Sequence, residues 1–144
     1  MDDVGARSKL AVVGCDGSDA SERGAARAAE LLAPGGTLVL VGVEVEAYSA
    51  GALSESLIEP GEHRAIRDAV ARAAARFSGR EGVRIETVVL RGDTAAVLVE
   101  LADRRGADLI VVGRRGRDFA ARVVLGSVAQ RVVESARCDV LVVA

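Results

Sequence analysis

The sequence predicts an α/β domain in which a parallel β-sheet is covered by helices on both of its faces. Two observations support this class. Short apolar runs bounded by Gly, Asp or charged residues are typical of strands that are buried on both faces. The segments between these runs carry apolar residues at the spacing of a helix. Strands and helices therefore alternate, and right-handed crossovers between them produce a parallel, doubly wound sheet.

Four of the five expected strands are compact apolar runs. They lie at residues 10–13, 38–43, 109–112 and 140–143. The fifth expected strand, at residues 83–89, alternates Val, Ile and Thr with Arg84 and Glu86. This period of two indicates a strand with one exposed face, which suits the edge of a sheet.

Four helices are expected to connect these strands. In each one, apolar residues recur at helical spacing and charged residues lie on the opposite face. The apolar positions are Ala25, Ala28, Ala29 and Leu32 in the first helix, Ile66, Ala69, Val70, Ala73 and Phe77 in the second, Val97, Leu98, Leu101 and Ala102 in the third, and Ala129, Val132, Val133 and Ala136 in the fourth.

Length and composition fit one domain with one sizeable core. The chain has 144 residues, and 50% of them are hydrophobic. Because it has no Trp, one Tyr and two Phe, the core must be filled by Val, Leu, Ile and Ala. We expect a flexible N-terminus at residues 1–8 and a domain at residues 9–144, interrupted by an irregular loop at 45–61.

The charge pattern disfavours nucleic acids and membranes as partners. The formal net charge is −2 with acidic and basic residues interspersed, so there is no basic field to hold a polyanion. No stretch approaches the length needed to cross a bilayer, and the acidic N-terminus lacks a signal sequence, so we expect a cytoplasmic protein. Cys15 and Cys138 lack metal or redox spacing and are expected to be small buried residues.

The turn after the strand at 109–112 has features of a phosphate site. Gly113 and Gly116 follow the strand, and Gly126 and Ser127 open the last helix. Glycines let the backbone approach an anion closely, and the N–H groups at a helix start carry partial positive charge. Taken singly, each glycine also fits a plain strand end or helix start. The sequence contains neither GxxxxGK[ST] nor GxGxxG.

The spacing Gly-x2-Gly-x9-Gly-Ser after Ala-Asp-Leu-Ile-Val-Val-Gly resembles the ATP-binding signature of universal stress proteins. The resemblance covers nearly the whole chain. It includes the first strand and turn at residues 10–18, the Arg-Gly-Asp at 91–93 and the closing segment at 138–143. In two places the sequence departs from the family pattern: Gly14 and Cys15 precede Asp16 where a proline and an apolar residue are common, and Asp139 replaces the usual proline.

The resemblance implies a sheet of five parallel strands in the order 3-2-1-4-5, with ATP at the carboxyl ends of the first, second and fourth strands. By this resemblance Asp16 lies near the ribose and the phosphates that carry Mg²⁺, and the backbone of Val43 meets adenine. Arg115 is placed where a cation meets the phosphates, although a solvated loop is an equal alternative. The expected nucleotide contacts are Gly14, Cys15, Asp16, Val43, Val112, Gly113, Arg115, Gly116, Gly126, Ser127 and Val128.

Asp16 also has a purely structural interpretation. The sequence Asp-Gly-Ser before a helix is ordinary turn and capping chemistry, with Ser18 or Asp19 as N-cap and Glu22 completing a capping box. This interpretation and the ligand contact can hold together.

The sequence favours a nucleotide binder over an enzyme. His63 is the only histidine and is expected at an exposed helix start, so neither a catalytic triad nor a zinc site is available. The site has no lysine, and Gln130 is the only weak candidate for orienting a water. We therefore expect an ATP-binding regulatory protein with slow or no hydrolysis, and ADP or AMP remain possible ligands.

Two alternatives are kept beside this expectation. One is a dimeric interaction module of the same fold that binds no nucleotide, and the other is an adenylating enzyme, for which the chain is short. A homodimer is also expected. The strand at 139–143 is short and apolar, and its free edge needs covering by a second copy. A regulatory protein partner is also expected, but no residue identifies it.

Overall fold

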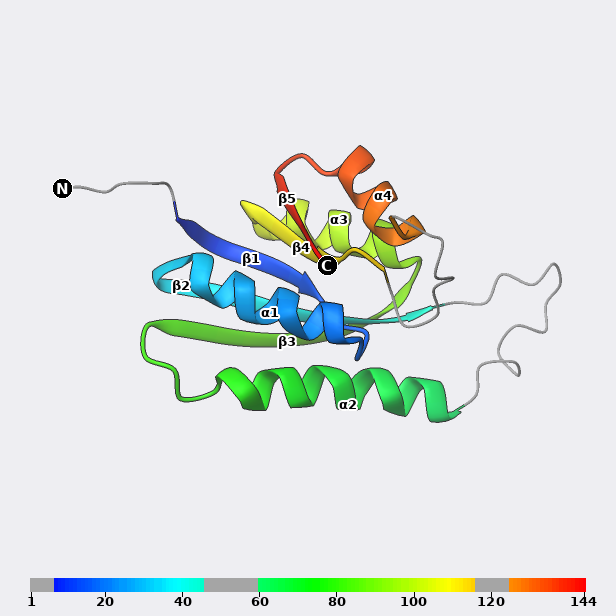
Figure 1. The fold of residues 1–144 in the computed structure, drawn as a ribbon, viewed down its shortest axis with the longest axis horizontal. Coiled ribbons are helices and arrows are strands. Elements are labelled where there is room, and N and C mark those ends of the chain that lie inside the picture. The colour runs from blue at the N-terminus through cyan, green and yellow to red at the C-terminus, as the bar shows by residue number, and fades with distance from the viewer. Residues whose placement is uncertain (1–6, 46–59, 116–124) are drawn as a thin grey trace, which may run out of the picture.

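Strands and helices alternate along the chain, as the sequence predicts. The computed structural model describes residues 7–45, 60–115 and 125–144, with the side chains of residues 60–62 outside that description. Within these ranges the elements are β1 (Ser8–Gly14), α1 (Asp19–Leu31), β2 (Leu32–Val45), α2 (Pro60–Phe77), β3 (Val83–Gly92), α3 (Thr94–Arg105), β4 (Leu109–Gly113), α4 (Ser127–Ser135) and β5 (Asp139–Val143) (Figure 1).

The five strands form one parallel sheet. β1 pairs with β2 and β4, β2 pairs with β3, and β4 pairs with β5, all in the parallel sense. The resulting order β3-β2-β1-β4-β5 confirms the predicted order 3-2-1-4-5. β3 lies at one edge of the sheet, as its alternating sequence indicated, and β5 lies at the other.

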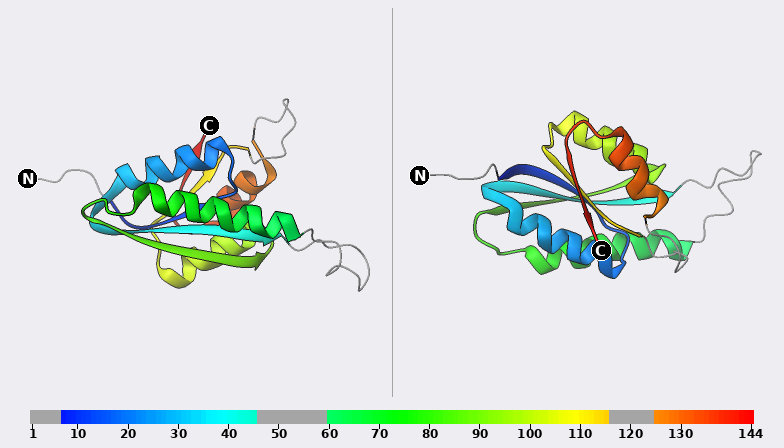
Figure 2. Two further views of the ribbon diagram at one scale, coloured as in Figure 1. Left: turned by 90° about the horizontal axis from the view of Figure 1, so that it is seen from below. Right: turned by 45° about the horizontal axis from the view of Figure 1, so that its top comes forward.

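Each face of the sheet carries one pair of helices, α1 and α2 on one side and α3 and α4 on the other (Figure 2). Alternate residues of the central strands enter the two cores, because successive side chains of a strand point to opposite faces. Val13, Leu40 and Val111 face the first pair, and Val12, Val41 and Ile110 face the second. The central strands are therefore buried on both sides.

Small residues let the helices approach the sheet. At Gly42 in β2, an added Cβ would lie 2.6 Å from Ile66 Cγ2 and 2.7 Å from Val70 Cγ2. Contacts this short do not occur between real carbon atoms, so only glycine permits α2 to lie where it does. The alanines of the predicted helix faces act in the same way, and Ala25, Ala28 and Ala73 are buried.

Helix starts and ends follow local chemistry. Ser18 is the N-cap of α1, and its Oγ accepts a hydrogen bond from the N–H of Ser21 at 3.1 Å. A capping box would need the acid at Ser21, three residues after the cap, so the proposed role of Glu22 in capping is wrong. At α3, the Asp93 carboxylate accepts from the N–H of Ala96, and Gly106 ends the helix in the left-handed conformation.

Some boundaries differ from those expected. β1 begins at Ser8, which pairs with Leu32 and donates a hydrogen bond to Asp108, so Ser8 belongs to the sheet. β2 continues to Val45 and α2 begins at Pro60, while the rest of the loop expected at 45–61 lies outside the described residues. Val133 was expected in a core, but it is 51% exposed. The buried residues of α4 are Ala129 and Val132.

One ion pair joins α4 to the start of α3. Arg131 donates to both carboxylate oxygens of Asp93 at 2.7 Å. This bidentate contact, together with the Ala96 N–H, lowers the pKa of Asp93 below its ordinary value.

We expect Asp93→Ala to lower the free energy of unfolding by about 1 kcal/mol, because it removes the N-cap of α3 along with the partner of Arg131. Urea denaturation at neutral pH measures the difference. Because the pKa of Asp93 is lower in the folded state, its contribution is present above about pH 4 and disappears as the pH falls through the folded-state pKa. Asp103→Ala, at an exposed position of the same helix, is the matched control, and an equal loss there would contradict the assignment.

Candidate functional site

The candidate site lies at the carboxyl edge of the sheet, where the strand connections diverge. β1 leads to β2 on one side, whereas β4 leads to β5 on the other, so β1 and β4 flank a topological switch point. In parallel α/β sheets, ligands bind in the crevice outside the carboxyl ends of strands at such a point. The chain reaches α1 directly from β1, and α4 begins near the end of β4.

The turn after β1 is held by backbone and side-chain hydrogen bonds. Cys15 N–H donates to the carbonyl of Val41 at 2.8 Å, which extends the β1–β2 ladder by one residue. Asp16 Oδ1 accepts from the N–H of Ser18 at 2.9 Å, as expected for a turn residue. Within the described part of the chain, Asp16 Oδ2 has no hydrogen-bond partner. One carboxylate oxygen thus stabilises the turn, and the second is available.

The thiol of Cys15 is a core group. Its side chain is 6% exposed and lies in the core under α1 and α2. Burial, followed by the adjacent Asp16 carboxylate, raises the pKa of this thiol to about 12. Val112, which is 4% exposed, is likewise packed in the opposite core. At both positions, only the backbone is positioned to meet a ligand.

Glycines at the end of β4 allow three segments to meet. A Cβ on Gly113 would lie 2.9 Å from Ala20 Cβ in the first turn of α1. Gly126 N–H donates to the carbonyl of Arg114 at 2.7 Å, which ties the start of α4 to the end of β4. A Cβ on Gly126 would approach that carbonyl oxygen to 3.1 Å. At Gly113 and Gly126, two glycines of the motif found in the sequence, a side chain would therefore crowd a neighbouring segment.

The N-terminus of α4 is open to a ligand. Gly126 is its N-cap and, having no side chain, leaves the first N–H groups of the helix without a side-chain acceptor. Ser127 is exposed and Val128 is half-buried, so the backbone here carries partial positive charge close to solvent. Arg115 is half-buried beside this turn, and Gly116, the other predicted glycine, lies outside the described residues.

The register of the sheet leaves backbone groups of Val43 without a strand partner. β1 pairs with β2 only as far as Gly14 opposite Val41, whereas β2 stays paired with β3 to Val45. The carbonyl of Val41 points toward β1, and alternate residues of a strand point their N–H and C=O the same way. The N–H and C=O of Val43 therefore face the space beyond the end of β1. One donor and one acceptor are available there, as an adenine edge requires.

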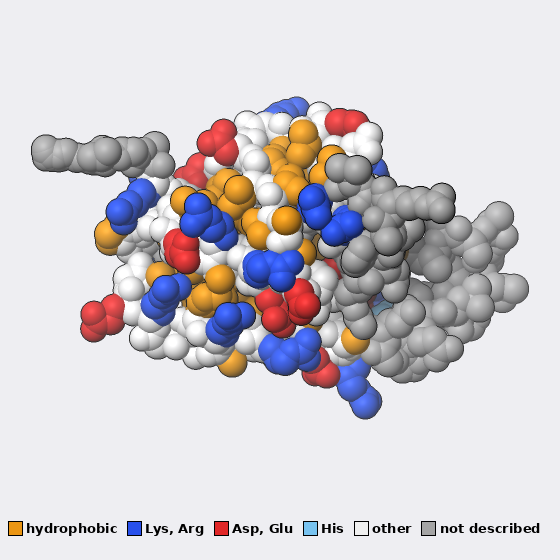
Figure 3. All heavy atoms as spheres, in the orientation of Figure 1, with side chains coloured by type: hydrophobic (Ala, Val, Ile, Leu, Met, Phe, Trp, Pro, Cys, Tyr) orange, Lys and Arg blue, Asp and Glu red, His pale blue; other side chains and the backbone are white. Residues whose placement is uncertain are grey.

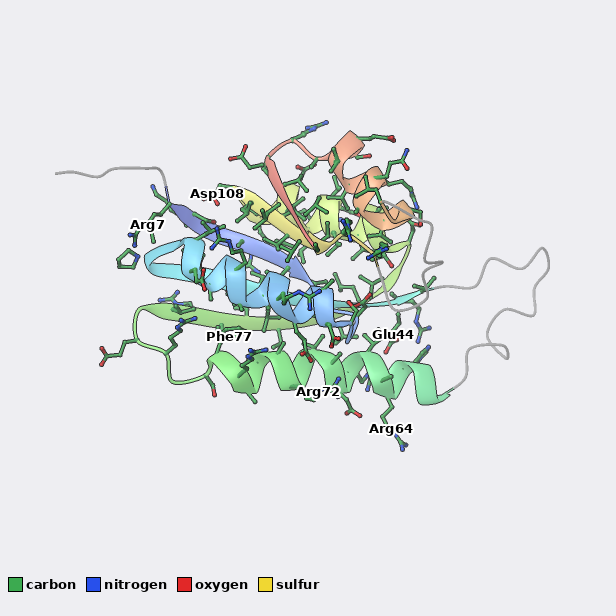
Figure 4. The ribbon with its side chains drawn as sticks, viewed as in Figure 1. Arg7, Glu44, Arg64, Arg72, Phe77 and Asp108 are labelled. Atoms are coloured by element: carbon green, nitrogen blue, oxygen red, sulfur yellow. The ribbon has the colours of Figure 1, made fainter. Side chains whose placement is uncertain are left out.

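A buried acid next to Val43 was missed by sequence reasoning. The Glu44 side chain is 5% exposed, although carboxylates are rarely buried. Two cations lie next to it, Arg67 with its Nε at 3.3 Å and Arg91 with a guanidinium nitrogen at 3.6 Å, and His63 Nδ1 lies at 3.5 Å. Figure 4 shows Glu44 at the end of the sheet nearest the start of α2. The only signal in the sequence is one acid between the valines at 43 and 45.

His63 is not the exposed residue that the sequence suggested. It lies in the first turn of α2, its side chain is 24% exposed and its Nδ1 faces Glu44. Among the described residues, no cluster of three or more His, Cys, Asp or Glu side chains is arranged to hold a metal ion. In that same part of the chain, every helix is too short or too polar to cross a bilayer.

Curated sequences similar to the chain are universal stress proteins. A protein of Thermus aquaticus is 36% identical over 140 residues, which cover 94% of this chain and 98% of that protein. A protein of Methanocaldococcus jannaschii is 40% identical over 91 residues, or 63% of this chain. That alignment spans only half of the length of the archaeal protein.

Solved structures with a similar fold carry the same family name. The universal stress protein UspA of Lactobacillus plantarum superposes with a TM-score of 0.74 at 25% identity, over 97% of this chain and all of the other. A universal stress protein crystallised in complex with cAMP superposes with a TM-score of 0.71 at 32% identity, over 96% of this chain and 98% of the other. The family model described as "Universal stress protein family" matches residues 8–144. The chain therefore belongs to the universal stress protein family.

Proposed function

We propose that this protein binds an adenine nucleotide, with ATP as its main ligand, at the carboxyl ends of β1, β2 and β4. The observation that carries the proposal is the coincidence of two unsatisfied backbone sites at one switch point. Val43 offers a donor and an acceptor suited to a base edge, and the open N-terminus of α4 offers N–H groups suited to phosphate. A relative that is 32% identical over nearly the whole chain was crystallised with cAMP, which supports an adenine nucleotide as the ligand class.

In this proposal the predicted residues contact different parts of the nucleotide. The backbone of Val43 binds adenine, and Gly14, Asp16 and the carbonyl of Cys15 contact the ribose side. The free oxygen of Asp16 supports Mg²⁺ that is bound mainly through the phosphates. The remaining contacts come from the β4–α4 segment, where backbone N–H groups, the Ser127 hydroxyl and one guanidinium meet the phosphates: Val112, Gly113, Arg115, Gly116, Gly126, Ser127 and Val128.

The chemistry of this site favours holding the nucleotide over hydrolysing it. Hydrolysis needs a group that orients the attacking water. Gln130 Nε2 donates to Glu134 Oε1 at 3.1 Å along the surface of α4, and His63 Nδ1 faces the carboxylate of Glu44. Gln130, the candidate expected from the sequence, and the imidazole of His63 therefore both already face carboxylates. We propose a regulatory binder with slow or no ATP hydrolysis that acts in the cytoplasm.

We expect ATP to stabilise the folded protein, by about 2.7 kcal/mol at a hundredfold excess over its dissociation constant. Thermal unfolding with ATP, ADP, AMP or cAMP measures this stabilisation and ranks the four ligands.

Gly126→Val should abolish the shift of the unfolding temperature by ATP, because its Cβ crowds the Arg114 carbonyl and its methyl groups cover the start of α4. Gly24→Ala crowds Val111 inside the α1 core instead, and should keep the ATP shift despite lower stability. A wild-type protein unaffected by all four nucleotides would favour the alternative, a nucleotide-free interaction module.

We also propose a homodimer through β5. β5 pairs with β4 along one side, and no described strand pairs with its other side. Its Val140, Leu141, Val142 and Val143 are all half-buried, so apolar surface remains on a strand with a free edge. A second copy whose own β5 lies against this edge would pair the free edge and bury the apolar side chains, and two-fold symmetry makes the contact the same for both copies.

We expect Leu141→Lys combined with Val143→Lys to convert the dimer to a monomer, because four charges would meet at the symmetric interface. Light scattering measures the mass, and circular dichroism confirms that the variant is folded. Val45→Lys combined with Leu90→Lys is the control, because these residues are exposed apolar positions on β2 and β3, toward the opposite edge of the sheet. A dimer mass that survives the β5 change would show that the interface lies elsewhere.

A further inference from the structure

A cavity lies between α1 and α2, on the face of the sheet and not at its carboxyl edge. Its volume is about 170 Å³, and it is lined by Glu22 and Ala25 of α1 and by Arg72, Ala73, Arg76 and Phe77 of α2. Figure 4 shows Arg72 and Phe77 on the same helix, α2. In Figure 3, orange hydrophobic side chains are visible on this face among blue and red ones. The cavity shares no residue with the proposed nucleotide site.

The floor of this cavity is apolar. Ala25, Ala73 and Phe77 are 1%, 9% and 5% exposed and belong to the core under the two helices. The alanines are too short to fill the space between α1 and α2, which is why a cavity remains. Engineered apolar cavities of roughly 150 Å³ accept a benzene-sized ligand. An aliphatic or aromatic group of up to that size therefore fits on this floor.

The rim carries opposite charges on its two walls. Glu22 stands on α1, and Arg72 and Arg76 stand one turn apart on the same face of α2. Because Ser18 caps α1 through Ser21, the carboxylate of Glu22 is not used in capping. Within the described ranges, neither Glu22 nor Arg72 makes a side-chain hydrogen bond or ion pair, so they do not satisfy each other across the groove. The Phe77 ring lies near two guanidinium groups, that of Arg76 at 6.0 Å from the ring centre and that of Arg80, which does not line the cavity, at 5.9 Å.

We propose that this cavity binds a small zwitterion with an apolar body, namely a free α-amino acid with an aliphatic or aromatic side chain. Its carboxylate binds Arg72 and Arg76, its ammonium binds Glu22, and its side chain lies on Ala25, Ala73 and Phe77. A simple carboxylate would leave Glu22 as an unpaired like charge, and a simple amine would face two guanidinium groups. Only a ligand with both charges matches both walls.

The ligand class is tested by titrating the protein with L-leucine and L-phenylalanine and following backbone amide signals by NMR. We expect saturable shifts at Ala25, Ala73 and Phe77. Leucinamide lacks the carboxylate and 4-methylpentanoate lacks the ammonium, so each should bind at least about tenfold more weakly than leucine. The absence of saturable shifts at millimolar leucine and phenylalanine would overturn the proposal, and so would equal binding of 4-methylpentanoate.

Single-charge variants test the two walls separately. Glu22→Gln and Arg72→Gln should each weaken leucine binding about tenfold, because each removes one charge-assisted contact. Neither side chain is paired in the structure, so Arg72→Gln should keep the urea midpoint of the wild type. Glu22→Gln should lower that midpoint only slightly, because Glu22 is an acid in the first turn of α1. Arg64→Gln is the matched control, an exposed arginine of α2 that does not line the cavity, and it should bind leucine normally. Unchanged affinity in Glu22→Gln would refute the zwitterion assignment.

Discussion

The close approach of helices to the sheet through glycine and alanine is the constraint on which the rest of the structure depends. Gly42 admits Ile66 and Val70 of α2, and Gly113 brings the end of β4 against Ala20 at the start of α1. The second contact sets the geometry of the carboxyl edge, because it fixes where a helix begins relative to the strand beside it. The same use of small residues leaves space between α1 and α2, where alanine side chains do not fill the groove.

The unequal lengths of the central strands create the candidate site. If β1 were as long as β2, it would pair with the backbone of Val43 and no donor or acceptor would remain. Instead the chain leaves β1 after Gly14 and turns through Asp16 into α1. On the other side of the switch point, Gly126 replaces a side-chain cap and leaves the N–H groups of α4 open. Both features arise where secondary structure ends, which is where backbone groups lack internal partners.

Glu44 connects this edge to α2. A buried carboxylate is unfavourable unless it is paired, and removing its partners would leave an uncompensated charge. Arg91 of β3 and Arg67 and His63 of α2 supply those partners, so two other elements converge on this side chain of β2 beside Val43. The first turn of α2 is thereby held against the sheet next to the proposed adenine contact. Hydrogen bonds and charges of this cluster join residues from separate parts of the chain, and no local pattern in the sequence indicates them.

The sequence by itself determined the α/β class, the alternation of strands and helices and most of the core, because these depend on local periodicity. It also placed Asp16, Gly113, Gly126 and Ser127 at turns and at a helix start, since these have local signatures, and family resemblance supplied the strand order. Only the tertiary structure decided that Glu44 is buried among cations, that Val133 is exposed and that Glu22 faces Arg72 across a cavity. These facts depend on strand register and helix spacing, which bring together residues far apart in sequence, and local patterns carry no information about such distances.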